Sequence, residues 1–414
     1  MSNQDNSRED QFAGWKKKIT LFLASQTLSL FGSSLVQYAI IWYITLTTQS
    51  GIMMTISTIC GFLPQIAISL FAGVWADRYS RKLLIIAGDV LIAFFTLILI
   101  ITFLLGYREL WLLFAISAIR SIGAGIQTPA VSAFIPQIVP PDRLMRVSGL
   151  NGSIQAIMMI VAPAASGALL VLWTLEVVFF VDLATAAAAV LIMSTIDAPP
   201  HPKESLQAGY LSNLFDGLQY VQQTSWVRSL LIYYALFMFL ITPAAFLTPL
   251  LIARSFGGEV WRLTANEMLF GGGAVLGGMI IAAWGGFRNR MHTLVLADIM
   301  FGLLTAALGL AGVFWVYLAI IFATGIFMPF FNSPSTVLLQ EKVPPEIQGR
   351  VFSLVGIVVS ASMPVGMMVF GPISDVIRVE LLLIVTGALI TVMALFMLGD
   401  KQLIQAGKPT VPNP

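Results

Sequence analysis

Apolar runs of about 20 residues follow one another along almost the whole chain, a length that crosses roughly 30 Å of membrane hydrocarbon as one helix. Short polar breaks separate the runs and carry the charged residues and many of the Gly and Pro residues, which favour turns. The pattern predicts an all-α polytopic membrane protein with about 12 spans, at 18–46, 51–75, 83–106, 110–134, 147–172, 176–196, 227–252, 266–285, 292–312, 314–339, 350–374 and 379–399.

A longer polar interruption separates the sixth and seventh predicted spans. It begins with a proline cluster and continues with a polar helical stretch near 213–223. We therefore predict two six-helix bundles joined by a cytoplasmic linker, with a short cytoplasmic tail at each end. The predicted bounds are 1–17 for the N-terminal tail, 18–196 and 227–399 for the bundles, 197–226 for the linker and 400–414 for the C-terminal tail.

The two predicted bundles also resemble each other in sequence. Val139-Pro140-Pro141 recurs as Val343-Pro344-Pro345 and Gly152 recurs as Gly356, both at an offset of 204 residues. Matches at one constant offset indicate an internal repeat. The repeat predicts that the two bundles are pseudo-symmetric.

Composition and charge agree with a membrane location and suggest an orientation. The 414 residues are 58% hydrophobic and 10% charged, whereas soluble domains carry about 25% charged residues. Of the 22 basic residues, 4 fall in loops on one side, Arg120 lies within a span and the other 17 lie on the opposite side or in the tails. Because basic residues mark the cytoplasmic side, we expect both termini in the cytoplasm.

Several classes of protein lack support in this sequence. Cys60 is the single cysteine, and His201 and His292 fall in different predicted loops, so we expect no metal site. The glycines at 271–273 and 277–278 lie in an apolar run without the Lys of a phosphate-binding loop, and they favour close helix packing instead. We therefore expect no ATP site, no cofactor and no nucleic-acid partner. A membrane enzyme or a sensor is a weaker alternative.

The charged break between the second and third spans has a distinctive pattern. Gly73, Asp77, Arg78, Arg81 and Lys82 form G-x-x-x-D-R-x-x-R-K. This pattern resembles the corresponding loop of major facilitator superfamily transporters. The resemblance implies two bundles that alternate access to a central site, with this loop as a conformational latch.

Arg120 lies about ten residues into the fourth span, hence about 15 Å deep. A charge at that depth costs about 3 kcal/mol on insertion scales, so it should face a cavity and have a partner. The acids Asp89, Asp182 and Asp298 also lie within predicted spans. Asp89 and Asp298 occupy related positions in the two halves, and we expect them to brace helices against loops. Arg120, Asp182 and Asp89 are the candidates for proton coupling.

Polar residues of the first span share one helical face. Gln26, Ser29, Ser33 and Gln37 are spaced by three or four residues. Such a stripe must face protein or water and not lipid. Because the stripe carries no charge, the cavity should prefer neutral or weakly basic lipophiles. Further candidates for the substrate cavity are Tyr38, Asn151, Gln155, Phe237, Phe331 and Asn332.

The fourth span and the loop after it, from Arg120 to Leu144, resemble the group of macrolide efflux proteins of the Mef type and the enterobactin exporter. Gly123 replaces a glutamine that is usual in this motif, and Ala162 replaces the usual glycine of an antiporter motif in the fifth span. The resemblance implies proton-driven export. We expect the substrates to be amphipathic, macrolide-like drugs, and we expect a monomer in a bacterial-type inner membrane. Siderophore or lysophospholipid transport is the alternative within the same fold.

Overall fold

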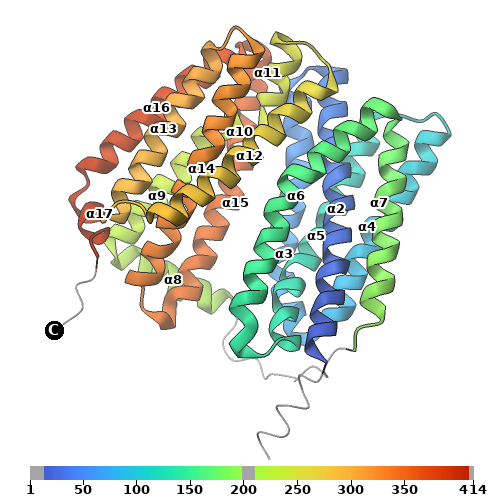
Figure 1. Ribbon diagram of the computed structural model, residues 1–414, viewed down its shortest axis with the longest axis horizontal. Coiled ribbons are helices and arrows are strands. Elements are labelled where there is room, and N and C mark those ends of the chain that lie inside the picture. Colours follow the sequence, from blue (N-terminus) through green and yellow to red (C-terminus); the bar gives the residue numbers. More distant parts are fainter. Residues whose placement is uncertain (1–13, 198–209, 410–414) are drawn as a thin grey trace, which may run out of the picture. The chain divides into compact units, whose positions relative to one another are not determined.

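The computed structural model describes residues 14–197 and 210–409, with the side chains of Leu70, Val74, Asp77 and 210–215 outside this description. Figure 1 shows that helices make up the described chain, and no strand occurs in these ranges. The prediction of an all-α protein is confirmed. The helices are α2 (Trp15–Thr48), α3 (Gly51–Arg78), α4 (Arg81–Leu104), α5 (Leu110–Ile138), α6 (Leu144–Leu172), α7 (Leu175–Ser194), α8 (Tyr210–Gln223), α9 (Ser225–Leu240), α10 (Thr242–Phe246), α11 (Thr248–Ser255), α12 (Val260–Trp284), α13 (Arg290–Leu310), α14 (Phe314–Lys342), α15 (Pro345–Val376), α16 (Val379–Gly399) and α17 (Lys401–Ala406), with a 3-10 turn at Pro141–Arg143.

Eleven helices within the described ranges are long and apolar enough to cross a membrane. The seventh predicted span, 227–252, is divided into α9, α10 and α11, and Pro243 and Pro249 lie in the first turns of α10 and α11. Proline lacks the N–H that a continuous helix needs but suits a first turn. Taken together, these three pieces occupy the place of a twelfth span.

The chain divides into two compact units. The first comprises Met1–Tyr43 and Ile56–Gln207, and the second comprises Ile44–Thr55 and Ala208–Pro414. In the first unit α4 packs against α5 and α7, and in the second α13 packs against α14 and α16. Each unit thus pairs its third helix with its fourth and sixth, as expected of an internal repeat.

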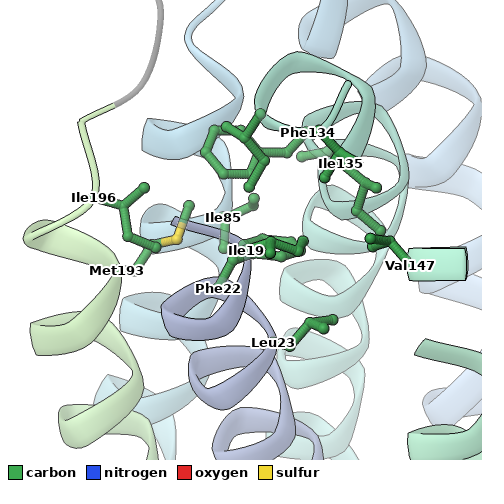
Figure 2. Close-up of a cluster of buried hydrophobic side chains, with 12 residues drawn as sticks. Ile19, Phe22, Leu23, Ile85, Phe134, Ile135, Val147, Met193 and Ile196 are labelled. Atoms are coloured by element: carbon green, nitrogen blue, oxygen red, sulfur yellow. The ribbon is translucent and has the colours of Figure 1, made fainter. Parts of the chain in front are cut away.

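A cluster of buried apolar side chains lies at one end of the first unit. Ile19 and Phe22 of α2 meet Ile85 of α4, Phe134 of α5 and Met193 of α7, as Figure 2 shows. The rings of Phe22 and Phe134 lie 5.1 Å apart. With Val147 of α6, the cluster joins five helices near the start of α4, and it holds the helices next to the α3–α4 loop together.

Asp375, near the end of α15, binds the start of α3 within the second unit. Its carboxylate accepts hydrogen bonds from the backbone N–H of Gly51 (2.7 Å), from the backbone N–H of Ile52 (3.0 Å) and from the hydroxyl of Ser50 (2.8 Å). Arg254 pairs with the same carboxylate at 2.8 Å. An acid is favourable at the start of a helix, where backbone N–H groups lack helical partners.

The predicted start of the eighth span was wrong. Helix α12 begins at Val260, six residues before the predicted 266, because the pair of Glu259 and Arg262 at its start made that turn look like a loop. The C-terminal tail contains α17, which packs through the fully buried Leu403. The carbonyl of Gly407 also accepts a hydrogen bond from the backbone N–H of Arg290.

Candidate functional site

The first unit contains a cavity of about 330 Å³ whose wall includes the predicted polar stripe of α2. Asn151 and Gln155 of α6 lie in the same wall, and so does Arg120 of α5. The volume falls within the range of about 300–1,000 Å³ that small-molecule pockets occupy. The structure therefore brings these predicted candidates together: Gln26, Ser29, Ser33, Gln37, Asn151, Gln155 and Arg120.

Arg120 has the partner that its depth requires. Its guanidinium pairs with the carboxylate of Asp182, on α7, at 2.5 Å, and it also contacts the hydroxyl of Thr96 on α4. That hydroxyl lies 3.1 Å from the same carboxylate oxygen. Asp182 is 1% exposed and Arg120 is 8% exposed. Two of the three candidates for proton coupling thus form one buried ion pair.

Asp89 forms a separate polar group. One of its oxygens accepts hydrogen bonds from the hydroxyl of Ser29 on α2 (2.6 Å) and from the amide of Gln127 on α5 (2.8 Å). Its other oxygen is buried and has no hydrogen-bond partner among the described residues. The expectation that Asp89 braces a helix against a loop was wrong, because both partners lie on neighbouring helices.

Asp89 and Asp182 do not themselves line the cavity. Arg120, Ser29 and Gln127 form part of its wall, while Asp89 and Asp182 lie behind them and are each 1% exposed. A molecule in the cavity would therefore touch the hydrogen-bond partners of the acids first. This arrangement can transmit a change between the cavity and a buried carboxylate without direct contact.

Close packing of α4 and α5 explains why Gly123 stands where the motif usually has a glutamine. A Cβ at this position would lie 2.7 Å from the side chain of Ile92 and 3.1 Å from the carbonyl oxygen of Gly88. Helices α4 and α5 therefore approach too closely for a side chain. The amide that would be expected at 123 is found one turn later, at Gln127, where it reaches Asp89.

The remaining cavity candidates lie elsewhere. Phe237 and Phe331 stack on each other with ring centroids 4.3 Å apart and are 3% and 4% exposed, so they belong to the packed core of the second unit. The ring of Tyr38 packs against Trp42 at 5.6 Å. Asn332 is exposed. None of these four lines the cavity of the first unit.

The charged loop at the end of α3 is tied to its own bundle. Arg81 donates hydrogen bonds to the carbonyls of Ala76 (3.1 Å) and Ala133 (2.8 Å). Lys82 donates to two carbonyls at the end of α7, those of Ser194 and Ile196, at 2.7 and 2.8 Å. Cations are favourable at the ends of helices, where carbonyls lack partners. These two side chains hold the loop in place.

The other predicted latch residues are less constrained in the structure. Arg78 is exposed, and a Cβ added to Gly73 would meet no atom within 4 Å. The side chain of Asp77 lies outside the described residues.

One intramembrane acid was missed in the sequence. Glu267 lies seven residues after the start of α12 at Val260, hence about 10 Å along the helix. Because the helix was expected to begin at 266, this acid seemed to lie at a membrane surface. The ion pair of Glu259 with Arg262, three residues apart, was the available signal that the helix begins earlier.

Comparison with known proteins assigns this sequence to a family. The family model described as Major Facilitator Superfamily matches residues 22–367. Macrolide efflux protein A of Streptococcus pyogenes is 30% identical over 392 residues, which cover 93% of this chain and 96% of that protein. The Staphyloferrin A transporter of Staphylococcus aureus is 20% identical over 81% of this chain and 84% of that protein.

Solved structures share the fold at lower identity. A crystal structure of a POT family transporter in complex with 5-aminolevulinic acid has a TM-score of 0.73, 14% identity and coverage of 94% of this chain and 96% of that chain. A bacterial homologue of the human lysosomal transporter Spinster has a TM-score of 0.68, 15% identity and coverage of 96% and 99% respectively. This chain, with its multiple membrane-spanning helices, therefore belongs to the Major Facilitator Superfamily of transporters.

Proposed function

We propose that this protein is a secondary active transporter that exports amphipathic drugs of the macrolide type in exchange for protons. The observation that carries the proposal is the ion pair of Arg120 with Asp182 at the wall of the cavity. It is supported by the extended similarity to a macrolide efflux protein. An acid and a base inside an apolar span are expensive, and proton relays are one of their main uses.

The pair offers a route from proton binding to the cavity. Protonation of Asp182 removes the charge that holds the guanidinium of Arg120, and Arg120 then has to find another acceptor in the cavity wall or in the substrate. Thr96 touches both groups and keeps them aligned. Binding of a drug to the wall and binding of a proton to Asp182 would thus compete through one side chain.

The proposed setting follows from the family and from the charge pattern. The transporter lies in the bacterial plasma membrane as a monomer, with both termini in the cytoplasm. The proton motive force supplies the energy, without ATP or a bound cofactor. Its partners are protons, the lipid bilayer and the drug. Access alternates between the two membrane faces, as the resemblance to the superfamily implies.

The latch proposal assigns Asp77 a role in switching between states. Arg81 and Lys82 hold the loop on its bundle, and Asp77 belongs to the same charged segment of the sequence. Asp77→Asn removes the charge and should slow turnover while ligand binding stays nearly unchanged. Transport rate and equilibrium binding, measured on the same preparation, test this. Unchanged transport would remove the latch from the mechanism.

The test of the function is uptake of a labelled macrolide into inverted vesicles that contain the purified protein. The vesicles carry an imposed acid interior, and a parallel sample receives an uncoupler. We expect uptake that is lost when the gradient collapses. Uptake that persists after collapse would contradict proton coupling, and no uptake in either sample would contradict the macrolide substrate.

Siderophore transport is the second candidate, because the Staphyloferrin A transporter resembles this chain over most of its length. The same vesicles, incubated with a labelled siderophore or a labelled lysophospholipid, distinguish the alternatives. Proton-dependent uptake of one of these compounds without macrolide uptake would replace the proposed substrate and keep the proposed energy source.

A further inference from the structure

Glu267 is an acid in an apolar helix of the second unit, and no described basic side chain pairs with it. It is half-buried, and its position about 10 Å beyond the start of α12 places it inside a helix long and apolar enough to cross a membrane. The nearest arginine in sequence, Arg262, is committed to Glu259 at 2.7 Å and lies over the rings of Trp261 and Phe314. A carboxylate at this depth needs a partner that compensates its charge.

A chain of neutral hydrogen bonds orients this carboxylate. The hydroxyl of Tyr317, on α14, donates to the amide oxygen of Asn266 at 2.8 Å. The amide nitrogen of Asn266 then donates to the carboxylate of Glu267 at 3.1 Å. Tyr317 is fully buried and Asn266 is 3% exposed. The oxygen of Asn266 is thus occupied, and its N–H₂ group is directed toward Glu267.

The chain of hydrogen bonds extends to a third helix, α11. Thr248, at the start of α11, lies within hydrogen-bonding reach of Tyr317 and is 2% exposed. Side chains from α11, α12 and α14 therefore hold one carboxylate in a defined place. Glu267 therefore has one oriented hydrogen-bond donor and no ion-pair partner among the described residues, unlike an acid whose contacts only join two helices.

The missing partner has a recognisable chemistry. A single carboxylate with one amide beside it suits one N–H⁺ donor, whereas Ca²⁺ takes six to eight oxygen ligands. Within residues 14–197 and 210–409, no three His, Cys, Asp or Glu residues come together as a metal site. The apolar span around Glu267 favours a ligand that is otherwise lipophilic.

We propose that Glu267, oriented by Asn266 and Tyr317, binds the protonated amine of lipophilic amine substrates. The proposal rests on the proposed function and narrows it, because it adds a preference for basic drugs. The polar stripe of α2 carries no charge, so this preference would come from the second unit. Tyr317 acts as a positioning residue through Asn266.

The experiment compares two ligands that differ only at the nitrogen. One is a macrolide with a dimethylamino sugar, and the other is the same macrolide with that nitrogen converted to a neutral amide. Dissociation constants are measured for the purified, full-length protein in lipid nanodiscs. We expect the wild type to bind the amine about tenfold more tightly than the amide.

Glu267→Gln should abolish that preference by weakening only the binding of the amine. Retained binding of the neutral amide shows that the variant is folded. Glu259→Gln, at the N-cap of the same helix, should keep the tenfold preference and serves as the matched control. Glu267→Asp keeps the charge and should keep part of the preference, and Tyr317→Phe should reduce it.

Failure of the role of Glu267 and failure of the proposed macrolide export give different experimental results. Equal binding of amine and amide by the wild type, or a preference that survives in Glu267→Gln, overturns the role of Glu267 and leaves macrolide export standing. If Glu267→Gln binds neither ligand, a reduced preference in Glu267→Asp supports the role and an undiminished tenfold preference overturns it. Binding of neither compound by the wild type overturns the macrolide substrate and this inference with it.

Discussion

Asp182 of the first unit and Glu267 of the second unit differ in how their negative charge is compensated. One oxygen of Asp182 is bound by both Arg120 and Thr96 behind the cavity wall. Glu267 is half-buried, receives one hydrogen bond from a neutral amide and has no ion-pair partner among the described residues. An acid with a built-in cation is held in place, whereas an acid without one is available to a ligand.

The largest effect should come from removing the cation of the first unit. Arg120→Ala leaves Asp182 as an unpaired buried charge, which costs about 3–5 kcal/mol in the free energy of unfolding. We also expect proton-driven uptake to fall at least about a hundredfold, since two tenfold losses correspond to about 2.8 kcal/mol. Thermal unfolding and vesicle uptake measure the two effects.

A double variant separates stability from transport in this pair. Arg120→Met with Asp182→Leu replaces both charges by apolar groups of similar size, which restores much of the stability in other buried pairs. We expect near-normal unfolding without proton-driven uptake. A fully active Arg120→Ala protein would reduce the pair to a tie between helices.

The next effect should come from crowding Asp182. A Cβ on Gly32 would lie 2.8 Å from the carboxylate of Asp182 and would also collide with the hydroxyl of Thr185. Gly32→Ala should therefore cost about 1–3 kcal/mol in the free energy of unfolding. Gly61→Ala is the control, because a Cβ there meets no atom within 4 Å. Equal effects of the two changes would show that Asp182 tolerates displacement.

A smaller effect should follow from weakening the support of Asp89. Ser29→Ala removes one of two hydrogen bonds to this acid and should cost about 1 kcal/mol in the free energy of unfolding. Ser34→Ala changes the same cavity wall away from Asp89 and is the control. If both variants unfold alike, the hydrogen bond from Ser29 contributes no measurable stability.

The smallest effect on stability should come from Glu267→Gln. No ion pair is broken, and the new side chain can still accept the hydrogen bond from Asn266, so the free energy of unfolding should change by less than about 0.5 kcal/mol. Asp182→Asn, measured in parallel, should be clearly less stable than wild type. A large loss of stability in Glu267→Gln would mean that this carboxylate has a charged partner within the protein. The contrast between Glu267 and Asp182 would then be wrong.

Much of the helical layout could be predicted because apolar length and charge are properties of single segments. Arg120 and Asp182 could each be identified from their position in an apolar run. Their pairing could not, because it depends on the register of α5 against α7. The break of the seventh span was signalled by Pro243 and Pro249, whose missing N–H groups favour helix starts.

The errors have physical causes as well. Phe237 and Phe331 are large enough either to line a cavity or to fill a core, and only their stacking decides between the two. Glu267 was overlooked because a boundary error of six residues moved it from the interior of a helix to its end. In a membrane protein, where depth decides the meaning of a charge, such an error changes the functional interpretation.

The attachment of Asp375 to the start of α3 has a consequence for engineering. The carboxylate binds the backbone N–H groups of Gly51 and Ile52, which every residue except proline provides. The side chain at 52 is therefore free to vary, while an insertion after Thr48 would present different N–H groups to Asp375. This connection is sensitive to the length of the chain and, at Gly51, to its composition, because a Cβ there would collide with the backbone carbonyl of Gly371. Epitope tags and reporter peptides therefore belong in other loops.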